Sequence, residues 1–342
     1  MDKAHPAPGH AAPARSAGQG VKPHMRSLPL RVGTRGSPLA LWQTRHFLGL
    51  LTTFCPVLRS MEVFEEHVIR TTGDATQAAG TRLADIGGKG LFAKEIHEAL
   101  DDRRIDFAVH SLKDLETQLP PGIVLACTLK REDARDALIL GPDCAAPDPA
   151  DPYAALPKGA LIGTSSVRRQ AQLLHARPDL QMTVLRGNVQ SRLGRVRAGE
   201  IGASLLAYAG LRRLGIGDEA DIVLDPAIMV PAAGQGIVGI TVRQDDTELL
   251  ELLAAIEDPE AKAVASAERA LLDTLDGSCR TPIGGYARLL DDGTLHLIGL
   301  VARADGSFLI KRERRGAAAD AVRMGAELGE ELRDDGPRDI FA

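Results

Sequence analysis

Short apolar runs alternate with amphipathic stretches from Leu28 onward, and this alternation restricts the fold more than any other feature of the sequence. The first run, LPLRVGT at 28–34, precedes a helical pattern over 37–51. The expected apolar stripe of that helix contains Leu41, Trp42, Leu48 and Leu51. Further strands are expected at 62–70, 105–110, 123–128, 160–164, 182–187 and 203–210, and further helices at 91–100, at 167–177 and up to about Arg197. This order predicts two α/β units with mainly parallel sheets, which could be related folds.

The pattern changes after Gln244. Two long helical patterns, near 246–256 and 259–275, precede three alternating runs (YARLL, TLHLIGLVA and SFLIKRER) and a last helix from Ala317 to about Asp334. Alternation in consecutive runs is typical of an antiparallel meander with one buried face. We therefore expect a separate α+β domain of about ninety residues at the C-terminal end.

Residues 1–27 differ from the rest, with four prolines, six alanines and a single acid. A segment without an apolar run cannot offset its ordering entropy, so a disordered extension is expected. A transit peptide is the alternative, although serine is sparse and proline frequent for that role.

The overall composition is that of a soluble globular protein of two or three domains, with 342 residues and a net charge of −5. No stretch is apolar and long enough to predict a membrane span, and no secretory signal peptide is visible. The cysteines share no metal-type spacing, so no metal site and a reducing, cytoplasmic compartment are expected. Buried or incidental thiols are expected for Cys55, Cys127 and Cys144.

The strongest local signal is a cluster of seven arginines between Gly163 and Arg197 that includes only one acid, Asp179. The guanidinium fork suits carboxylates and phosphates, whereas nucleic-acid binding would also call for stacking aromatics, and none occurs before Tyr208. Solvated helix positions are favoured for Arg177, Arg195 and Arg197, and an anion site for Arg168, Arg169, Arg186 and Arg192.

Two strand-to-helix junctions support an anion site. GTSSVRR begins at Gly163, and GTRGSP begins at Gly33, and in each an arginine and a serine lie where free backbone amides attract anions. Ser37 is also placed as a helix N-cap before Pro38, and the sequence leaves capping and ligand contact both open. Two similar junctions predict a ligand held between two α/β domains.

Three further segments carry candidate chemistry. The strand ending in His110 is followed by Ser111-Leu112-Lys113-Asp114, where a carboxylate could stabilise a developing cation. GGKGLF lacks the P-loop spacing, so Lys89 is interpreted as a loop residue within reach of an anion. Cys279 lies between Gly, Ser and Arg280, where a nearby cation lowers a thiol pKa; a nucleophile or attachment point and an incidental loop cysteine are equally favoured.

Eleven segments in one order resemble the porphobilinogen deaminase family, from Leu28 to about Ile340. They are RVGTRGSPLALWQT, TTGD, GGKGLFAKEI, DFAVHSLKD, REDARDA, GTSSVRRQAQL, LRGNVQSRL, AGLRRLG, PAAGQG, AERALL and GSCRTPIGGYA. The resemblance implies a transferase that joins four porphobilinogen molecules head to tail, with loss of ammonia, into hydroxymethylbilane for tetrapyrrole biosynthesis.

The same resemblance implies a dipyrromethane cofactor attached covalently to Cys279, and no metal. Asp114 matches the catalytic carboxylate. The positions matching cofactor-binding residues are Ser111, Lys113, Asp114, Thr164, Ser166, Arg168, Arg169 and Arg186. Those matching substrate-binding residues are Arg35, Ser37, Lys89, Arg168, Arg186, Arg192, Arg213 and Gln235.

The family fold implies two α/β domains of the periplasmic-binding-protein type and a C-terminal α+β domain with a three-stranded antiparallel sheet. The implied division is 28–135 with 231–246, then 136–230, then 247–342. A monomer without nucleic-acid or membrane partners, passing its product to uroporphyrinogen-III synthase, is expected. The alternative from the residues alone is a non-enzymatic two-domain anion-binding protein of the periplasmic-binding type.

The chain departs from the family pattern at several loop positions. Leu115-Glu116 follows the Asp114 turn where Val-Pro is usual, and Ala134 replaces a common proline. Asp85 stands where lysine is frequent and Gly202 where aspartate is common. These departures affect loops and the expected hinge rather than any proposed catalytic group.

Overall fold

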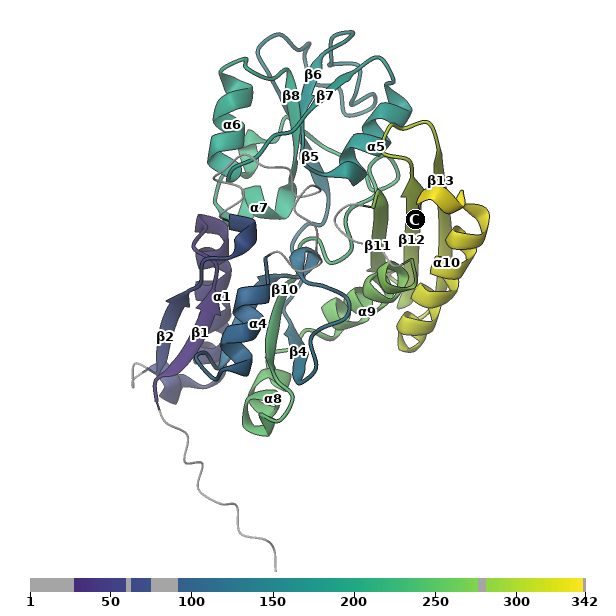
Figure 1. Ribbon diagram of the computed structural model, residues 1–342. Helices are drawn as coiled ribbons and strands as arrows, with labels where there is room; N and C mark the ends of the chain where they lie inside the picture. Colours follow the sequence, from purple (N-terminus) through teal and green to yellow (C-terminus); the bar gives the residue numbers. More distant parts are fainter. Residues whose placement is uncertain (1–27, 60–62, 75–91, 276–280, 341–342) are drawn as a thin grey trace, which may run out of the picture.

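The computed structural model describes residues 28–59, 63–74, 92–275 and 281–340. These residues form three sheets with their helices. In Figure 1 the second sheet lies above the first, and the third sheet lies to the right of both. The architecture is mixed α/β followed by an antiparallel α+β unit, as the sequence predicts.

The first sheet has the order β2-β1-β3-β10-β4. Its strands are β1 (Leu30–Thr34), β2 (Phe64–Val68), β3 (Phe107–Ser111), β4 (Ile123–Thr128) and β10 (Val238–Arg243). Its helices are α1 (Pro38–Phe54), α4 (Lys94–Asp101) and α8 (Thr247–Ala254). Strand β1 runs parallel to β2 and β3, whereas β10 is antiparallel to both of its neighbours. The sheet is therefore completed by a strand that returns from far along the chain.

The second sheet repeats this plan, with the order β7-β6-β8-β5-β9. Its strands are β5 (Asp136–Leu140), β6 (Leu161–Gly163), β7 (Gln181–Thr183), β8 (Ala203–Ala207) and β9 (Ile222–Val223). Its helices are α5 (Val167–Ala176), α6 (Val189–Arg197) and α7 (Tyr208–Arg213). Strand β5 is the antiparallel member here, in the place that β10 takes in the first sheet. The expectation that the two units are related folds agrees with this shared strand order, and in each sheet four of the five strands run in one direction, as the predicted mainly parallel sheets require.

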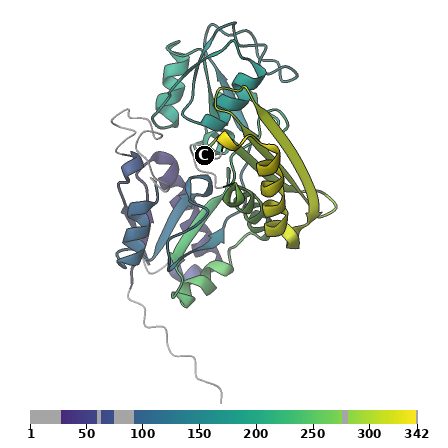
Figure 2. The same cartoon turned by 45° about the vertical axis from the view of Figure 1, so that its right-hand side comes forward.

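The third unit contains α9 (Pro259–Thr274), β11 (Ile283–Leu289), β12 (Thr294–Ala302), β13 (Leu309–Ala317) and α10 (Ala321–Asp335). Figure 2 shows α10, in yellow, lying across one face of this antiparallel sheet. Helices α9 and α10 pack closely against each other. A Cβ built on Gly325 of α10 would overlap the carbonyl oxygen of Ala267 of α9, so only glycine fits at this contact. The opposite sheet face packs Ile298 and Leu300 against Ala171 and Val230, which attaches this unit to the second one.

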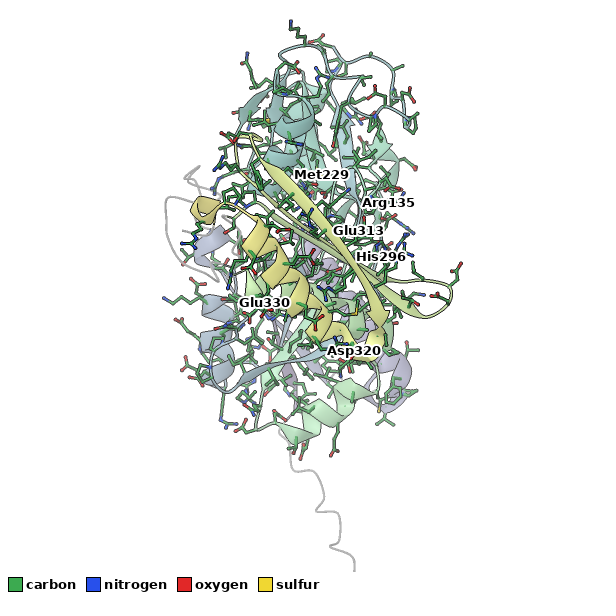
Figure 3. The ribbon with its side chains drawn as sticks, turned by 90° about the vertical axis from the view of Figure 1, so that its right-hand side faces the viewer. Arg135, Met229, His296, Glu313, Asp320 and Glu330 are labelled. Carbon is green, nitrogen blue, oxygen red and sulfur yellow. The ribbon has the colours of Figure 1, made fainter. Side chains whose placement is uncertain are left out.

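The remaining helical turns are short 3-10 segments: η1 (Pro56–Arg59), η2 (Leu112–Asp114), η3 (Gly217–Glu219), η4 (Ala318–Asp320) and η5 (Arg338–Ile340). In the sheet of the third unit, His296 of β12 lies beside Glu313 of β13, with His296 Nε2 3.0 Å from Glu313 Oε2 (Figure 3). No helix among the described residues is long and apolar enough to cross a membrane.

Four expectations need correction. The stripe of α1 was wrong in part: the buried face contains Ala40, Gln43, Thr44, Phe47 and Leu51, whereas Leu41, Trp42 and Leu48 are half-buried. The run 203–210 is a strand only to Ala207, after which α7 begins. Strand β7 ends at Thr183 rather than continuing to residue 187. The periodicity of 136–140 and 222–223 gave no strand prediction, although both pair in the second sheet.

Helix α8 bears on the division into domains. Its Leu249 and Leu253 belong to the same core cluster as Phe47 and Phe107, which is the core of the first sheet. The implied start of the third domain at residue 247 would separate this helix from its packing partners. We therefore propose that the third domain starts near Pro259, at α9.

Candidate active site

Three neighbouring strands of the first sheet bring Asp74, Arg35 and Asp114 together. Because β2, β1 and β3 are parallel, the segments that follow their carboxyl ends meet at one edge of the sheet, the usual place for ligand groups. Arg35 Nη1 lies 3.7 Å from Asp114 Oδ2. Arg35 also donates to both carboxylate oxygens of Asp74, with its Nε 3.1 Å from Oδ1 and 3.3 Å from Oδ2. The structure thus places the predicted catalytic carboxylate beside a predicted binding arginine.

Asp74 holds Arg35 in place. Burial alone would raise the pKa of Asp74, but the hydrogen bonds and charge of Arg35 and a hydrogen bond from Thr71 lower it. The ring of Phe92 lies under the guanidinium, 4.2 Å from its carbon to the ring centroid. Arg35 is therefore fixed on two sides, and Asp114, with 32% of its side chain exposed, is the more open of its two carboxylate partners.

Lys113 lies next to Asp114 in the turn η2. Its Nζ donates to Gln235 Oε1 at 3.3 Å. Burial lowers the pKa of Lys113 to about 8, with the charges of Arg168 and Arg169 acting in the same direction against Asp114 and Asp136. This ammonium group would gain from a further anion nearby.

Asp136 binds both arginines at the start of α5. Arg168 Nη1 lies 2.8 Å from Asp136 Oδ2, and Arg169 Nη2 donates to Asp136 Oδ1 at 2.7 Å. Arg168 also donates to the carbonyl of Val230, and Arg169 to that of Leu205. Asp136 is fully buried, and its pKa is lowered because the two arginines outweigh the effect of burial. Two of the three arginines predicted to bind the cofactor, Arg168 and Arg169, are thus engaged by a carboxylate of the protein itself.

Gln235 connects this buried cluster to Lys113. Its Nε2 donates to Asp136 Oδ1 at 2.8 Å and to the carbonyl of Ala134 at 2.7 Å. The side chain is 1% exposed, so its predicted contact with substrate would require the cluster to open. Its substrate-binding role therefore stays a prediction.

Thr164 and Ser166 are used at the beginning of α5. Ser166 caps the helix by accepting from the backbone N–H of Arg169 at 3.4 Å, and Thr164 Oγ1 accepts from the backbone N–H of Ser166 at 3.1 Å. On the first sheet, Ser37 likewise caps α1 by accepting from the backbone N–H of Ala40 at 3.2 Å. Helix capping is confirmed for Ser37, as the sequence predicts.

Arg192 belongs to α6 of the second unit, and its charge faces Asp114 of the first. Burial lowers the pKa of Arg192 to about 10, with Arg169 and Arg186 adding to the effect and Asp114 opposing it. Its Nε donates to the carbonyl of Gly187 at 2.8 Å. Arg186 follows the end of β7 by three residues rather than ending the strand. The arginines of the second unit and the carboxylate of the first thus share one electrostatic environment.

Arg213 lies where α7 meets α1. Its Nη2 donates to the carbonyl of Gly236 at 2.7 Å, and its guanidinium carbon lies 5.7 Å from the centroid of the Trp42 ring. The residue is 8% exposed, and burial lowers its pKa to about 10. Ser111 exchanges hydrogen bonds with the buried amide of Gln43 at 2.9 and 3.1 Å. Arg213 therefore connects α7 to Gly236 and to α1, and Ser111 connects the end of β3 to α1.

Cations exceed anions in this region, which bears on the fit of an anionic group. Among the described residues, the acids are Asp74, Asp114 and Asp136, and the cations are Arg35, Lys113, Arg168, Arg169, Arg186 and Arg192. Burial lowers the pKa of Lys113 and of Arg192, the charge of Asp114 opposes both shifts, and a further anion would act in the same direction as Asp114. A polycarboxylate such as a dipyrromethane fits this donor set. Cys279, Lys89 and Asp85 lie outside the described residues.

Arg195 and Arg197 lie at exposed positions, as expected, whereas Arg177 is half-buried and donates to the carbonyls of Tyr153 and Leu156. Arg177 pairs with Asp179, Arg195 with Glu200, and Arg197 with Glu219 and Asp221. Within the ranges that the structure describes, no group of three His, Cys, Asp or Glu residues could hold a metal ion. Cys127 is buried, and Cys55 and Cys144 are half-buried free thiols.

Sequence reasoning missed Asp74, Gln43 and Asp136 as members of the site. All three lie in segments already noted (TTGD, RVGTRGSPLALWQT and REDARDA), but no local property distinguishes the two carboxylates or the amide from surface groups. Arg131 of the last of these segments was also missed: it forms an ion pair at 2.6 Å with the fully buried Glu268 of α9. Contacts this distant in sequence leave no periodic signal.

Comparisons with known proteins match the chain over most of its length. The family model described as "Porphobilinogen deaminase, dipyromethane cofactor binding domain" matches residues 30–251, and "Porphobilinogen deaminase, C-terminal domain" matches 261–334. The porphobilinogen deaminase of Syntrophobacter fumaroxidans (strain DSM 10017 / MPOB) is 44% identical over 312 residues, which cover 91% of this chain and 96% of that one.

Solved structures give weaker matches. The periplasmic VFT2 domain of Bordetella pertussis BvgS has a TM-score of 0.38 and 14% identity over 70% of this chain and 91% of its own. A periplasmic binding protein from Brucella ovis with glutathione bound has a TM-score of 0.36 and 15% identity, over 72% of this chain and 68% of its own. Likenesses this low support no argument about function. The family matches do not favour the alternative of a non-enzymatic two-domain anion-binding protein.

Proposed function

The chain belongs to the porphobilinogen deaminase family, and from this premise we propose that Asp114 is its catalytic carboxylate, held in place by Arg35. The family activity is that of a transferase that joins porphobilinogen molecules head to tail into hydroxymethylbilane. The observation that supports the assignment is the meeting of Asp114, Arg35 and Asp74 at one edge of the first sheet, with Arg192 of the second unit within electrostatic reach.

Asp114 suits the demands of the reaction. When the aminomethyl group of porphobilinogen loses ammonia, the pyrrole carries positive charge, and a fixed carboxylate close to it lowers the energy of that state. The carboxylate can also accept hydrogen bonds from pyrrole N–H groups. Arg35 Nη1 lies 3.7 Å from Asp114 Oδ2, close enough to hold the carboxylate in position. Asp74 shares the charge of Arg35, so Asp114 is not fully neutralised.

The surrounding cations bind the acetate and propionate groups of the substrate and the growing chain. Arg35, Lys113, Arg186 and Arg192 surround the position of Asp114, and Ser37, Thr164 and Ser166 lie at the two helix N-termini. Binding of these carboxylates by the buried residues requires them to share or release their present partners. These residues are Arg168, Arg169, Arg213 and Gln235.

The cofactor is a dipyrromethane attached to Cys279, and it supplies the pyrrole to which the first substrate is joined. The residues proposed to hold it are Ser111, Lys113, Asp114, Thr164, Ser166, Arg168, Arg169 and Arg186. Intact-mass measurement of protein made in a host that synthesises porphobilinogen tests the attachment. Wild type should carry the added mass of a dipyrrole, and Cys279→Ala should not; an unmodified wild-type chain would contradict the proposal.

The catalytic assignment is tested with Asp114→Ala. We expect ammonia release to be abolished while the circular dichroism spectrum and thermal midpoint stay close to wild type. Glu200→Ala, which removes an exposed partner of Arg195, is the matched acid control and should retain full activity. Substantial ammonia release by Asp114→Ala would refute the role.

We further propose a cytoplasmic monomer that passes hydroxymethylbilane to uroporphyrinogen-III synthase. The family activity supports this, because a linear tetrapyrrole must be consumed by an enzyme that closes it. Light scattering coupled to size exclusion should give a single species of about 36.4 kDa. To test this transfer, the rate of uroporphyrinogen-III synthase is measured with hydroxymethylbilane formed in the same mixture by this enzyme and with the same concentration of free hydroxymethylbilane. A higher rate with the enzyme-formed product supports direct transfer, and equal rates contradict it.

A further inference from the structure

A group of buried polar atoms without partners lies next to the turn that carries Asp114. His97, on α4, is 3% exposed, and among the described residues neither of its ring nitrogens has a hydrogen-bond partner. Its ring centroid lies 5.8 Å from that of His110, the residue of β3 that precedes the turn η2. Buried imidazole nitrogens without partners are uncommon in folded proteins and call for an explanation.

Glu116 supplies the complementary group. It lies two residues after Asp114, and its buried Oε2 likewise has no hydrogen-bond partner in the part of the chain that the structure describes. Its backbone is fixed, because Arg269 of α9 donates from Nη2 to the carbonyls of Glu116 at 2.7 Å and Thr117 at 2.9 Å. Burial lowers the pKa of His97, and the Glu116 carboxylate is the charge that opposes this shift. Ala93, one turn before His97, belongs to the same core cluster as Leu115, so the two segments pack together, with a donor on His97 and an acceptor on Glu116.

Leaving such atoms unpaired costs about 1–3 kcal/mol for each group. A water molecule between two polar groups restores these bonds, and buried waters in proteins occupy such positions. Glu116 also stands where the family usually has proline, so this chain contains a carboxylate that the turn itself does not require.

We propose that His97 and Glu116 form a hydrogen-bonded pair, joined through one buried water molecule, that positions the turn carrying Asp114. The proposal rests on the catalytic role assigned above to Asp114. The pair links α4 to the residue that follows η2, while Arg269 links that same residue to α9. Movement of the turn is thereby restricted from two sides.

The neighbouring groups set the protonation of the pair. His110 faces His97 from β3; its Nε2 lies 3.0 Å from Thr241 Oγ1, and burial lowers its pKa to about 3, so it is neutral at physiological pH. Arg35 and Arg269 are the cations whose charge reaches His110, and Glu116 is the anion that reaches His97. Neutral His97 donates one N–H toward the carboxylate of Glu116, and acidification adds a second.

Steady-state kinetics test the pair. Glu116→Gln and His97→Phe should each lower kcat by about 10- to 100-fold with little change in KM, because a misplaced catalytic group reduces turnover more than binding. The double variant should be no slower than the slower single variant, since both changes break one interaction. His97→Gln, which retains an N–H donor, should recover most of the activity.

Proton NMR titration gives an independent measurement. In Glu116→Gln the pKa of His97 should fall by about one unit or more relative to wild type, since an opposite charge at this range shifts a pKa by about 1–3 units. His67, on β2, is the control and should not change. A His97 pKa unchanged in Glu116→Gln, additive effects in the double variant, or wild-type kcat in both single variants would each overturn the pair.

These outcomes separate the pair from the catalytic assignment. Activity in Asp114→Ala refutes the role of Asp114 itself. An inactive Asp114→Ala together with a fully active Glu116→Gln refutes only the positioning pair. If His97→Phe does not fold, His97→Gln and the titration of Glu116→Gln still decide the question.

Discussion

Replacing Asp136 by asparagine tests the buried cluster that joins the two α/β units. The change keeps the shape of the side chain and removes its charge, which leaves Arg168 and Arg169 buried without their counter-ion. These arginines are 5% and 6% exposed, so solvent does not compensate the loss. Removing one partner of a buried ion pair costs about 3–5 kcal/mol, and we expect Asp136→Asn to lower the free energy of unfolding by that amount.

The assay is urea unfolding at pH 7, followed by circular dichroism, with the midpoint and slope recorded for both proteins. Glu200→Gln, which breaks the exposed pair with Arg195, should leave the midpoint nearly unchanged. A loss below about 1 kcal/mol in Asp136→Asn would refute the reasoning, because that is the range of exposed pairs. The sign with pH follows from the lowered pKa of Asp136: its stabilisation is present above the unfolded-state pKa and is lost as the pH falls through the folded-state pKa.

Three further predictions follow from the described contacts. With the pKa of Lys113 lowered to about 8, kcat/KM should decline above that pH, and Lys113→Arg should move the decline to higher pH; an unchanged profile would exclude Lys113. The pKa of His110 is lowered to about 3 in the folded protein, so the unfolded chain binds a proton at His110 more readily. The free energy of unfolding of wild type should therefore decrease as the pH drops below 6.5. His110→Gln should reduce this decrease in urea titrations at pH 7 and pH 5. Gly325→Ala should cost about 1–3 kcal/mol by forcing α10 away from α9, whereas Gly194→Ala, with open space around its Cβ, should stabilise by about 0.4–1 kcal/mol; equal thermal midpoints would contradict this.

The sequence predicted the type of most elements because periodicity is a local property. The helix from Pro38 had its cap and first-turn proline in view, and the meander from Ile283 to Ala317 had regular alternation. Strand β5 was missed because its burial is continuous, and four apolar residues after Asp136 do not identify the strands with which they pair.

The site was predictable in its residue types but not in its pairings. The arginines of α5 were selected as anion ligands, and their proximity to Lys113 agrees with that selection. That Asp136 occupies both of them depends on β5 lying next to β8, which is set by tertiary structure alone. The same holds for Asp74 and Arg35, which meet because β1 and β2 are parallel neighbours.

The return of β10 to the first sheet has a consequence for synthesis on the ribosome. Strands β3 and β4 do not pair with each other, because β10 lies between them, and β10 is made only after the whole second unit. During translation the first unit therefore exposes two unpaired strand edges while more than one hundred residues emerge, from Leu129 to Ile237. Nascent chains of this topology present a template for wrong pairing, so the growing polypeptide should depend on protection by chaperones until Arg243 has left the exit tunnel.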